Sequence, residues 1–405
     1  MLFLLLAALL AQPTTRPTTL PDELPDAPQA PPASAEDGMI DVDPPATRRS
    51  EIGNAVYVGQ DILYDYDPTP ALVTEVHEVA RSKYSVIDVH CHWPIQVAQD
   101  DLLAAMDERN VAYAVNLSGG YGDELGKMLA VYDSPRLITF LNIDWEGLGT
   151  DGWESQTEQA IRDAHAAGAK GVKIWKNLGL TLKDSSDRLV PVDDARLEVV
   201  WRTAGELDMP VLIHIADPAA FFQPIDENNE RWMQLFRHPD WSFYGEEFPS
   251  REEVLAQRDR IVEKFPGTTF IGAHVANNAE DLKWVAQRLR KYPNLYADIS
   301  GRVEELGRQP YTTRKFLIEF QDRILFGTDR YPGRLDQPRY AIYYRFLETA
   351  DEYFKPYDHP FPPSGDWRIC GVFLPDEVLE KIYWSNAAKL LRLEPRVGDS
   401  PAENQ

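Results

Sequence analysis

Residues Val86–His92, VIDVHCH, decide how the rest of this chain is interpreted. The apolar residues of this stretch predict a buried strand, which ends in two histidines that lie two positions apart. Because alternate side chains of a strand point to the same side, His90 and His92 are expected to face one side together. Neutral imidazole is the commonest ligand of zinc-like ions in proteins. Two histidines alone are more often ordinary strand residues, so the metal-site interpretation depends on the rest of the chain.

Three later apolar segments also end in a residue that can bind a metal or transfer a proton. They are Val211–His214 (VLIH), Phe270–His274 (FIGAH) and Ile324–Asp329 (ILFGTD). Three imidazoles and a carboxylate can hold one divalent ion and leave a position open for water or substrate. Asp329 can ligate the ion and also accept a proton from the water, while a further histidine polarises a substrate oxygen or transfers a proton.

The composition excludes several classes of protein. The chain has 405 residues, a hydrophobic fraction of 43% and a formal net charge of -24. It can bury a sizeable core, whereas nucleic acid and anionic membranes are poor partners for so acidic a protein. Cys91 and Cys370 are the only cysteines, which does not imply a disulfide framework. Strand alternation turns Cys91 away from the two histidines, so we interpret it as a small buried hydrophobic residue.

The composition also divides the chain into segments. Residues 1–11, MLFLLLAALLA, are too short to span a bilayer and resemble the apolar part of a secretory signal peptide. Apart from the amino terminus itself, the usual positive charge at the start of such a peptide is missing. We therefore expect an exported protein, periplasmic or secreted, with no transmembrane segment in its mature form. Residues 12–50, rich in Pro and Thr, predict a disordered spacer. Residues 51–395 are expected to form the catalytic domain, and residues 396–405 a flexible tail.

Strands and helices alternate from Tyr84 onward, which predicts a (β/α)₈ barrel, an α/β fold. The predicted strands are Val86–His92, Ala112–Leu117, Leu137–Ile143, Gly171–Trp175, Val211–Ile215, Thr269–His274, Leu295–Ile299 and Ile324–Gly327. The predicted helices include Asp100–Arg109, Ser155–Ala167, Asp194–Leu207, Glu252–Phe265 and Asp281–Lys291. No glycine-rich phosphate-binding motif follows the first strand, which argues against a dinucleotide-binding sheet. All the metal-site candidates then lie at carboxyl ends of strands, at one mouth of the barrel.

Strand alternation also predicts which residues face the helices and which face the barrel interior. The residues expected to face the helices are Val89, Val172, Ile174, Ile213 and Ile271. Lys173 and Trp175 are then expected to point inward. A buried ammonium group requires a partner. Lys173 could be carboxylated and bridge two metals, could bind a substrate carboxylate, or could pair with Asp298, and the sequence leaves these roles open.

Two long segments complete the prediction. The connection after the fifth strand, 216–250, carries many aromatic residues and is expected to form a lid or a binding wall, or else to pack on the barrel rim. The segment 337–393 is expected to be helical, to close the barrel and to offer a surface for a second subunit. Whether the protein forms homo-oligomers stays open.

The five strand-end segments, in this order, resemble the amidohydrolase superfamily, specifically its amidohydrolase-related branch. That branch includes metal-dependent hydrolases and non-oxidative decarboxylases. The matching segments are Ile87–His92, Gly171–Ile174, Val211–His214, Gly272–His274 and Phe326–Asp329, and the resemblance extends from Ser85 to Leu393.

The resemblance implies roles for particular residues. His90, His92, His214 and Asp329 would be the metal ligands, and His274 would lie beside the metal and act on substrate or proton. In an alternative with two metals, His274 would itself be a ligand.

Residues next to the strand ends are candidates for substrate binding. Arg302 and Arg330 follow the seventh and eighth strands, where they could bind an anionic group together with Lys173, or could form surface ion pairs. Asp298 and Ser300 lie at the end of the seventh strand, and they either line the site or satisfy buried hydrogen bonds.

The expected function is that of a metal-dependent hydrolase acting on a small molecule. A metal-activated water attacks an amide, ester or lactone carbonyl, Asp329 takes the proton, and His274 steadies the developing oxyanion. The expected cofactor is one divalent ion, Zn²⁺ first, with Mn²⁺ or Fe²⁺ as alternatives. The rival hypotheses are a non-oxidative decarboxylase of a carboxylic acid, possibly aromatic, and a non-catalytic binding protein on the same scaffold.

Overall fold

A computed structural model describes residues 49–52, 55–58, 69–332, 339–357 and 364–393 of the chain. The chain divides into two compact units, residues 1–62 and 63–405. In the first unit, β1 (Arg49–Ile52) pairs antiparallel with β2 (Ala55–Val58). The predicted signal-like segment, the spacer up to residue 48 and the tail 396–405 lie outside the described residues. Within the described ranges, no helix has both the length and the apolar character needed to cross a membrane.

All eight predicted strands are present in the second unit, and they pair in parallel. They are β3 (Val86–Cys91), β4 (Val111–Asn116), β5 (Leu137–Thr139) continued by β6 (Leu141–Asn142), β7 (Val172–Ile174), β8 (Val211–Ile213), β9 (Phe270–Gly272), β10 (Leu295–Asp298) and β11 (Ile324–Leu325). Pairing follows chain order, from β3 to β5 and from β6 to β11. A single residue, Phe140, separates β5 from β6, so the two pieces form one interrupted strand.

Hydrogen bonds between the first and last strands close the barrel. The amide of Val89 donates to the carbonyl of Phe326 at 3.0 Å, and the amide of Asp329 donates to the carbonyl of His90 at 2.9 Å. The amide of His92 donates to the carbonyl of Arg330 at 3.2 Å. The strands therefore form the predicted (β/α)₈ barrel, with the seam between β3 and β11.

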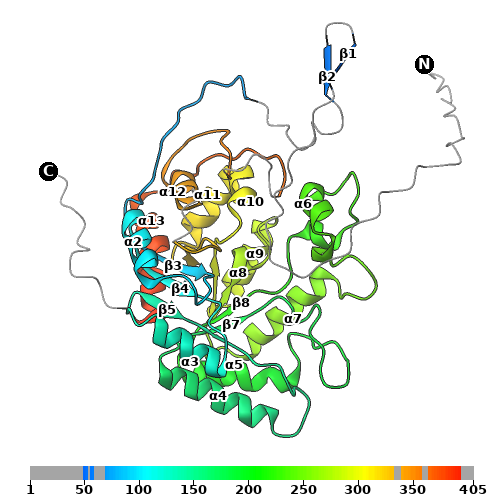
Figure 1. Ribbon diagram of the computed structural model, residues 1–405, viewed down its shortest axis with the longest axis vertical. Helices are drawn as coiled ribbons and strands as arrows, with labels where there is room; N and C mark the ends of the chain where they lie inside the picture. Colours follow the sequence, from blue (N-terminus) through cyan, green and yellow to red (C-terminus); the bar gives the residue numbers. More distant parts are fainter. Residues whose placement is uncertain (1–48, 53–54, 59–68, 333–338, 358–363, 394–405) are drawn as a thin grey trace, which may run out of the picture. The chain divides into compact units, whose positions relative to one another are not determined.

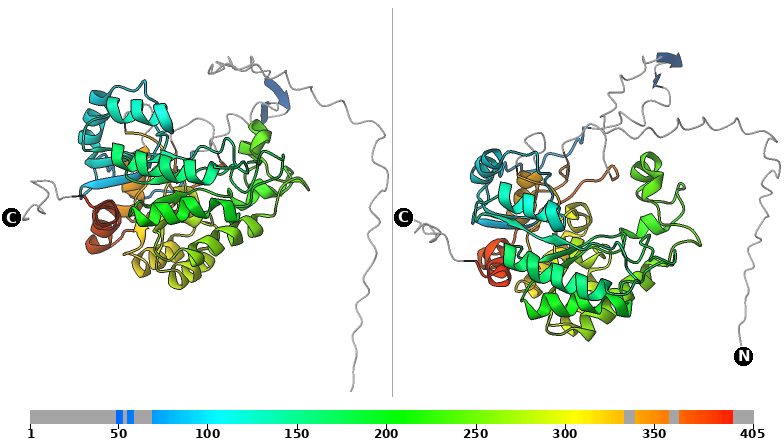
Figure 2. Two further views of the ribbon diagram at one scale, coloured as in Figure 1. Left: turned by 90° about the horizontal axis from the view of Figure 1, so that it is seen from below. Right: turned by 60° about the horizontal axis from the view of Figure 1, so that its bottom comes forward.

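Helices surround the strands (Figures 1 and 2). They are α2 (Gln99–Arg109), α3 (Gly122–Val131), α4 (Trp153–Ala167), α5 (Glu198–Glu206), α7 (Arg251–Lys264), α9 (Leu282–Lys291), α10 (Val303–Arg308), α11 (Pro310–Glu319) and α12 (Arg339–Glu348). The five predicted helices are confirmed, the third of them beginning with a 3₁₀ turn, Ala195–Leu197. Side-chain caps fix two helix starts, since Ser250 accepts from the amide of Glu253 and Asp281 from that of Trp284.

The register of the strands separates the inside of the barrel from the outside. Lys173 lies opposite Leu212, and Leu212 opposite Ile271, so these three side chains share the interior face. Val89 packs in the same interior cluster as Leu212 and Ile271. The prediction that Val89 and Ile271 face the helices was therefore wrong. The prediction assumed that side chains alternate regularly up to His90 and His274. This fails in β3, because its register shifts between Asp88 and Cys91, and in β9, because the strand already ends at Gly272.

The chain's last described helices cover one end of the barrel. These elements are α13 (Asp376–Glu380), a π-helical turn (Lys381–Ser385) and α14 (Asn386–Leu391). Ala387 and Leu391 pack with the interior cluster, and the carbonyl of Ile382 accepts from the amide of Phe326. This part of the tail closes the barrel, as the sequence predicted.

The long connection after β8 contains short helical elements. They are a 3₁₀ turn (Ala219–Phe222), α6 (Trp232–Arg237) and a second 3₁₀ turn (Pro239–Trp241). The connection leaves the carboxyl end of a barrel strand, where the functional sites of this architecture lie.

Candidate metal and active site

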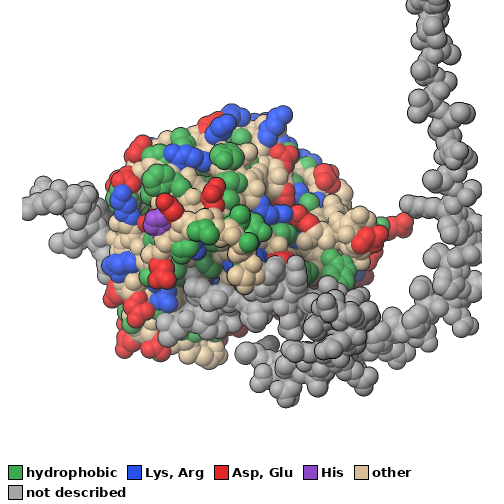
Figure 3. All heavy atoms as spheres, turned by 90° about the horizontal axis from the view of Figure 1, so that it is seen from above, with side chains coloured by type: hydrophobic (Ala, Val, Ile, Leu, Met, Phe, Trp, Pro, Cys, Tyr) green, Lys and Arg blue, Asp and Glu red, His purple; other side chains and the backbone are tan. Residues whose placement is uncertain are grey.

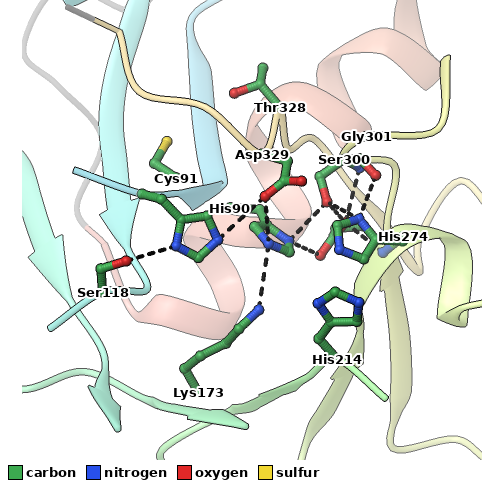
Figure 4. A network of polar contacts seen from close by, with 12 residues as sticks. His90, Cys91, Ser118, Lys173, His214, His274, Ser300, Gly301, Thr328 and Asp329 are labelled. Carbon is green, nitrogen blue, oxygen red and sulfur yellow. Dashed lines mark hydrogen bonds and ion pairs between the residues drawn. The ribbon is translucent and has the colours of Figure 1, made fainter. Parts of the chain in front are cut away.

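The carboxyl ends of five strands bring the predicted site residues into one polar cluster (Figure 4). His90 lies in β3 and His92 directly after it, while Lys173 lies in β7. His214 follows β8, His274 follows β9, and Asp329 lies four residues beyond the last residue of β11. All six side chains belong to the barrel's mouth, as the strand-end pattern predicted.

Asp329 is the point on which two histidines converge. Its Oδ1 atom is 3.5 Å from Nε2 of His90 and 3.3 Å from Nε2 of His92. His90, His274 and Asp329 also offer three ligand atoms that all lie within 4.8 Å of one another. The structure thus brings His274 into a group that could hold an ion, whereas the resemblance implied a place beside the metal or, with two metals, a ligand role.

The other ring nitrogens of these histidines already have partners. Nδ1 of His90 is 2.9 Å from a carboxylate oxygen of Asp298, and Nδ1 of His92 is 2.9 Å from the hydroxyl of Ser118. Nδ1 of His274 is 2.8 Å from the carbonyl oxygen of Ser300. The carboxylate and carbonyl acceptors fix the tautomers of His90 and His274 and leave the lone pair of Nε2 available for a metal, while the hydroxyl of Ser118 orients the ring of His92. The donor set therefore fits a divalent ion.

His214 lies close to this group, with its ring centroid 4.4 Å from that of His274. Its Nε2 atom is 3.4 Å from a carboxylate oxygen of Asp217, which also forms a 2.6 Å ion pair with Lys176. Sequence reasoning missed Asp217, because a single acid in a loop carries no periodic signal. Lys176 is 37% exposed and holds Asp217 in place.

Lys173 is fully buried and points into the site. Its Nζ atom is 3.5 Å from Nε2 of His90 and lies 5.0 Å from the ring centroid of Trp175. It forms no salt bridge with any residue of the described chain, so the ion pair with Asp298 is not formed. Burial lowers the pKa of Lys173 to about 8, against the opposing charges of Asp329 and Asp298.

Burial also decides the protonation of the site. It lowers the pKa of His92 to about 4, although Asp329 opposes the shift, and it lowers the pKa of His214 to about 4 against Asp217. The pKa of Asp329 is well below its ordinary value because the contacts with the surrounding histidines outweigh the effect of burial. Neutral imidazoles and an ionised carboxylate are the forms that bind metal ions.

The backbone is strained where the site residues leave their strands. Asp329 has a φ of 60°, and the four successive residues His274 to Asn277 have φ between 52° and 59°. Left-handed backbone is costly for residues other than glycine and gathers at functional sites. This turn also ends β9 at Gly272, two residues before the predicted end of the strand.

The two arginines predicted to bind substrate border the cluster in different ways. The guanidinium of Arg302 donates to the carbonyl of Gly301 at 2.6 Å, and its charge contributes to the lowered pKa of His274, of which burial is the main cause. Arg330 directly follows Asp329, and its carbonyl accepts the seam hydrogen bond from His92. Their role in substrate binding stays a prediction.

Comparisons with known proteins agree with this architecture. Residues 149–393, more than half of the chain, match the family model described as Amidohydrolase. The match includes His214, His274 and Asp329 and begins after His90 and His92. No curated protein sequence matches the chain.

Several solved structures are similar to this chain at low identity. An uncharacterized TIM-barrel protein of Bordetella bronchiseptica is 14% identical, with 76% of this chain and 99% of that one covered and a TM-score of 0.48. A dihydroxybenzoic acid decarboxylase of Polaromonas, solved with manganese and an inhibitor, is 16% identical, with 76% and 97% covered and a TM-score of 0.48. A putative amidohydrolase of Staphylococcus aureus is 17% identical, with 77% and 100% covered and a TM-score of 0.46.

Proposed function

Because the chain belongs to the amidohydrolase family, we propose that it is a metal-dependent hydrolase of small molecules with an amide, ester or lactone carbonyl. The observation that carries this proposal is the convergence of two imidazole nitrogens on one oxygen of Asp329. The opposite nitrogens of both rings are held by Asp298 and Ser118, which is the arrangement that prepares histidines for a metal.

A divalent ion at this site would supply Lewis-acid chemistry, by lowering the pKa of a water molecule and polarising the substrate carbonyl. Zn²⁺ is the proposed ion, with Mn²⁺ or Fe²⁺ as alternatives, because imidazole and carboxylate ligands suit all three. His90, His92, His214 and Asp329 are the proposed ligands. Ligand atoms of His90, His274 and Asp329 lie within 4.8 Å of one another, and the ring of His214 lies 4.4 Å from that of His274.

The protein's own groups would handle the proton and the developing charge. Asp329 is ionised, and its Oδ1 faces His90 and His92, so Oδ2 is the oxygen that would accept the proton of the attacking water. His274 is buried, and its Nδ1 donates to the carbonyl oxygen of Ser300, so its proposed role in steadying the oxyanion requires a second proton on Nε2. Asp329 would then return the proton to the leaving group.

Lys173 favours a second candidate function, non-oxidative decarboxylation of a carboxylic acid. A buried ammonium group without a salt bridge is costly, and a substrate carboxylate beside His90 would supply the missing charge. The same residue could instead orient an anionic substrate of a hydrolase, so the reaction class requires a direct assay.

The test compares the wild-type protein with His92→Ala and Asp329→Asn variants, each stripped of metal and reloaded with Zn²⁺ or Mn²⁺. Aryl esters, lactones, amides and aromatic carboxylic acids are the substrates, and both hydrolysis products and released CO₂ are measured. We expect hydrolysis that needs the metal and falls by at least about 100-fold in both variants.

His165→Ala is the matched control, because His165 is an exposed histidine on α4, and its activity should equal that of the wild type. Release of CO₂ without hydrolysis would show that the protein is a decarboxylase and not a hydrolase. Equal turnover in the metal-free and reloaded proteins would contradict both.

A further inference from the structure

Two buried aspartates outside the ligand group bind the backbone on which the candidate ligands sit. Asp88 lies in β3, two residues before His90, and Asp298 is the last residue of β10. Neither side chain is exposed to solvent. From their contacts we propose that Asp88 and Asp298 are positioning residues that hold the candidate ligands His90 and Asp329, and His274 beside them, in place around the metal position before the metal arrives. This inference rests on the proposed metal site and deepens it.

Asp88 joins the two strands that form the barrel seam. Its Oδ1 accepts from the amide of His90 at 3.0 Å and from the amide of Thr328 at 3.2 Å. Its Oδ2 accepts from the hydroxyls of Thr328 and Tyr340, both at 2.6 Å. One carboxylate thus fixes the residue that carries the first ligand and the residue just before Asp329.

These hydrogen bonds support the backbone at two places where regular strand structure is interrupted. The register of β3 shifts between Asp88 and Cys91, so the regular ladder does not run through His90. Asp329 has a left-handed backbone, which needs support from its surroundings. Because Asp88 binds the amides of His90 and Thr328, it stabilises the irregular strand and the start of the strained turn together.

Asp298 repeats the arrangement on the next pair of strands. Its Oδ1 accepts from the amide of His274 at 3.1 Å and from the amide of Ser300 at 2.9 Å. In both cases the carboxylate binds the amide two residues further along its own chain segment and one amide of a neighbouring segment. The amide of His274 belongs to the left-handed turn after β9.

Asp298 has one further contact that Asp88 lacks. Its Oδ2 lies 2.9 Å from Nδ1 of His90. A carboxylate can only accept there, so Nδ1 of His90 carries the hydrogen and Nε2 is left with its lone pair toward the site. Asp298 therefore sets both the backbone of His274 and the tautomer of His90.

Replacing the aspartate by asparagine should have opposite effects on metal affinity at positions 88 and 298. Asp88→Asn keeps one oxygen for the two backbone amides, and the hydroxyls of Thr328 and Tyr340 can rotate to accept from the new amino group. Asp298→Asn also keeps an oxygen, but its amino group would donate to Nδ1 of His90. The hydrogen of that ring then moves to Nε2, which can no longer bind a metal.

The experiment measures the affinity of the metal-free protein for Zn²⁺ and for Mn²⁺ by titration calorimetry, together with thermal unfolding. We expect affinity to fall by about 10- to 100-fold in Asp88→Ala and in Asp298→Asn, and to stay within about threefold of the wild type in Asp88→Asn. Because Asp88→Ala can fail to fold, the two asparagine variants carry the test on their own.

Asp351→Ala is the control for lost stability without lost positioning. Asp351 is also buried and binds the amide of His77 and the guanidinium of Arg345, away from the ligand group. This variant should unfold at lower temperature yet bind metal as tightly as the wild type. If Asp298→Asn binds metal as tightly as the wild type, the positioning inference is overturned while the proposed metal site stands. A wild-type protein that takes up neither metal would overturn the proposed function with it.

Discussion

Gly327 occupies a position at which His90 leaves no room for a side chain. A Cβ atom added there would lie 2.9 Å from Cβ of His90 and 3.2 Å from Cβ of Ser300. We therefore expect Gly327→Ala to displace His90, to lower the free energy of unfolding by about 1–3 kcal/mol and to weaken metal binding. Chemical denaturation and metal titration measure the two effects.

Gly267→Ala is the matched substitution, since nothing lies within 4 Å of a Cβ atom at that position. It should leave metal affinity unchanged. Equal metal affinity in Gly327→Ala and Gly267→Ala would mean that the contact between Gly327 and His90 does not control the site.

Asp351 gives the fold a predictable response to pH. Burial raises its pKa, but hydrogen bonds from the amide and ring of His77 and from Arg345 outweigh burial, so the net pKa is lowered. A lowered folded-state pKa stabilises the protein above the unfolded-state value, about 3.9, and this stabilisation is lost as pH falls through the folded-state pKa.

The prediction is that Asp351→Asn costs about 2 kcal/mol of unfolding free energy at pH 7 and progressively less below about pH 4. Denaturation curves at several pH values measure the difference. A cost that stays constant from pH 7 to pH 3 would show that the ionised form of Asp351 contributes nothing.

At the scale of elements, buried charges attach the long connection after β8 to α10. Arg231, just before α6, pairs with Glu305 of α10, and both side chains are almost completely buried. Next to this pair, Glu230 binds Arg308 at 3.0 Å. Two successive residues of the connection are thus held by one short helix, so this segment is anchored rather than free to swing.

Removing one partner of the buried pair should be costly. Glu305→Gln removes the charge that pairs with the buried Arg231, and we expect a loss of about 3–5 kcal/mol in unfolding free energy, or local opening of the connection. Unfolding curves and limited proteolysis between α6 and α7 detect these outcomes. The double variant Arg231→Met/Glu305→Leu should recover most of the loss, and a double variant as unstable as Glu305→Gln would contradict a charge-based cost.

Elements with strong local patterns could be predicted, and those without could not. Each barrel strand is an apolar run between polar turns, so all eight were found from the sequence. The end of β9 was not, because four successive left-handed residues with side chains have no sequence signal. Asp217 and Ser118 were missed for a related reason, since a loop residue's partner depends on how distant segments fold together.

At the scale of the whole molecule, the strand order alone predicted that the strand-end residues would meet at one mouth. The sequence could not predict which of them would share an ion, because that depends on shifts of a few ångströms in strand register. The net charge of -24 was equally uninformative about the site. On the face shown in Figure 3, acidic, basic and hydrophobic side chains are interspersed.

A metal that binds the folded protein alone must also stabilise the whole barrel. The candidate ligands come from β3 and from the turns after β9 and β11, so unfolding separates them and releases the ion. Mass action then adds about 2.7 kcal/mol to the free energy of unfolding when free metal is 100 times its dissociation constant. The unfolding temperature should rise with the logarithm of the metal concentration and fall again on chelation.

Calorimetric unfolding of the chelated protein at increasing Zn²⁺ or Mn²⁺ measures this dependence. His92→Ala should weaken it, because Nε2 of His92 is one of the two nitrogens that face Asp329. His165→Ala should leave it unchanged, because His165 is exposed on α4. If the unfolding temperature rises equally in the wild type and in both variants, the stabilising ion does not bind through His92. It would then bind elsewhere on this acidic protein.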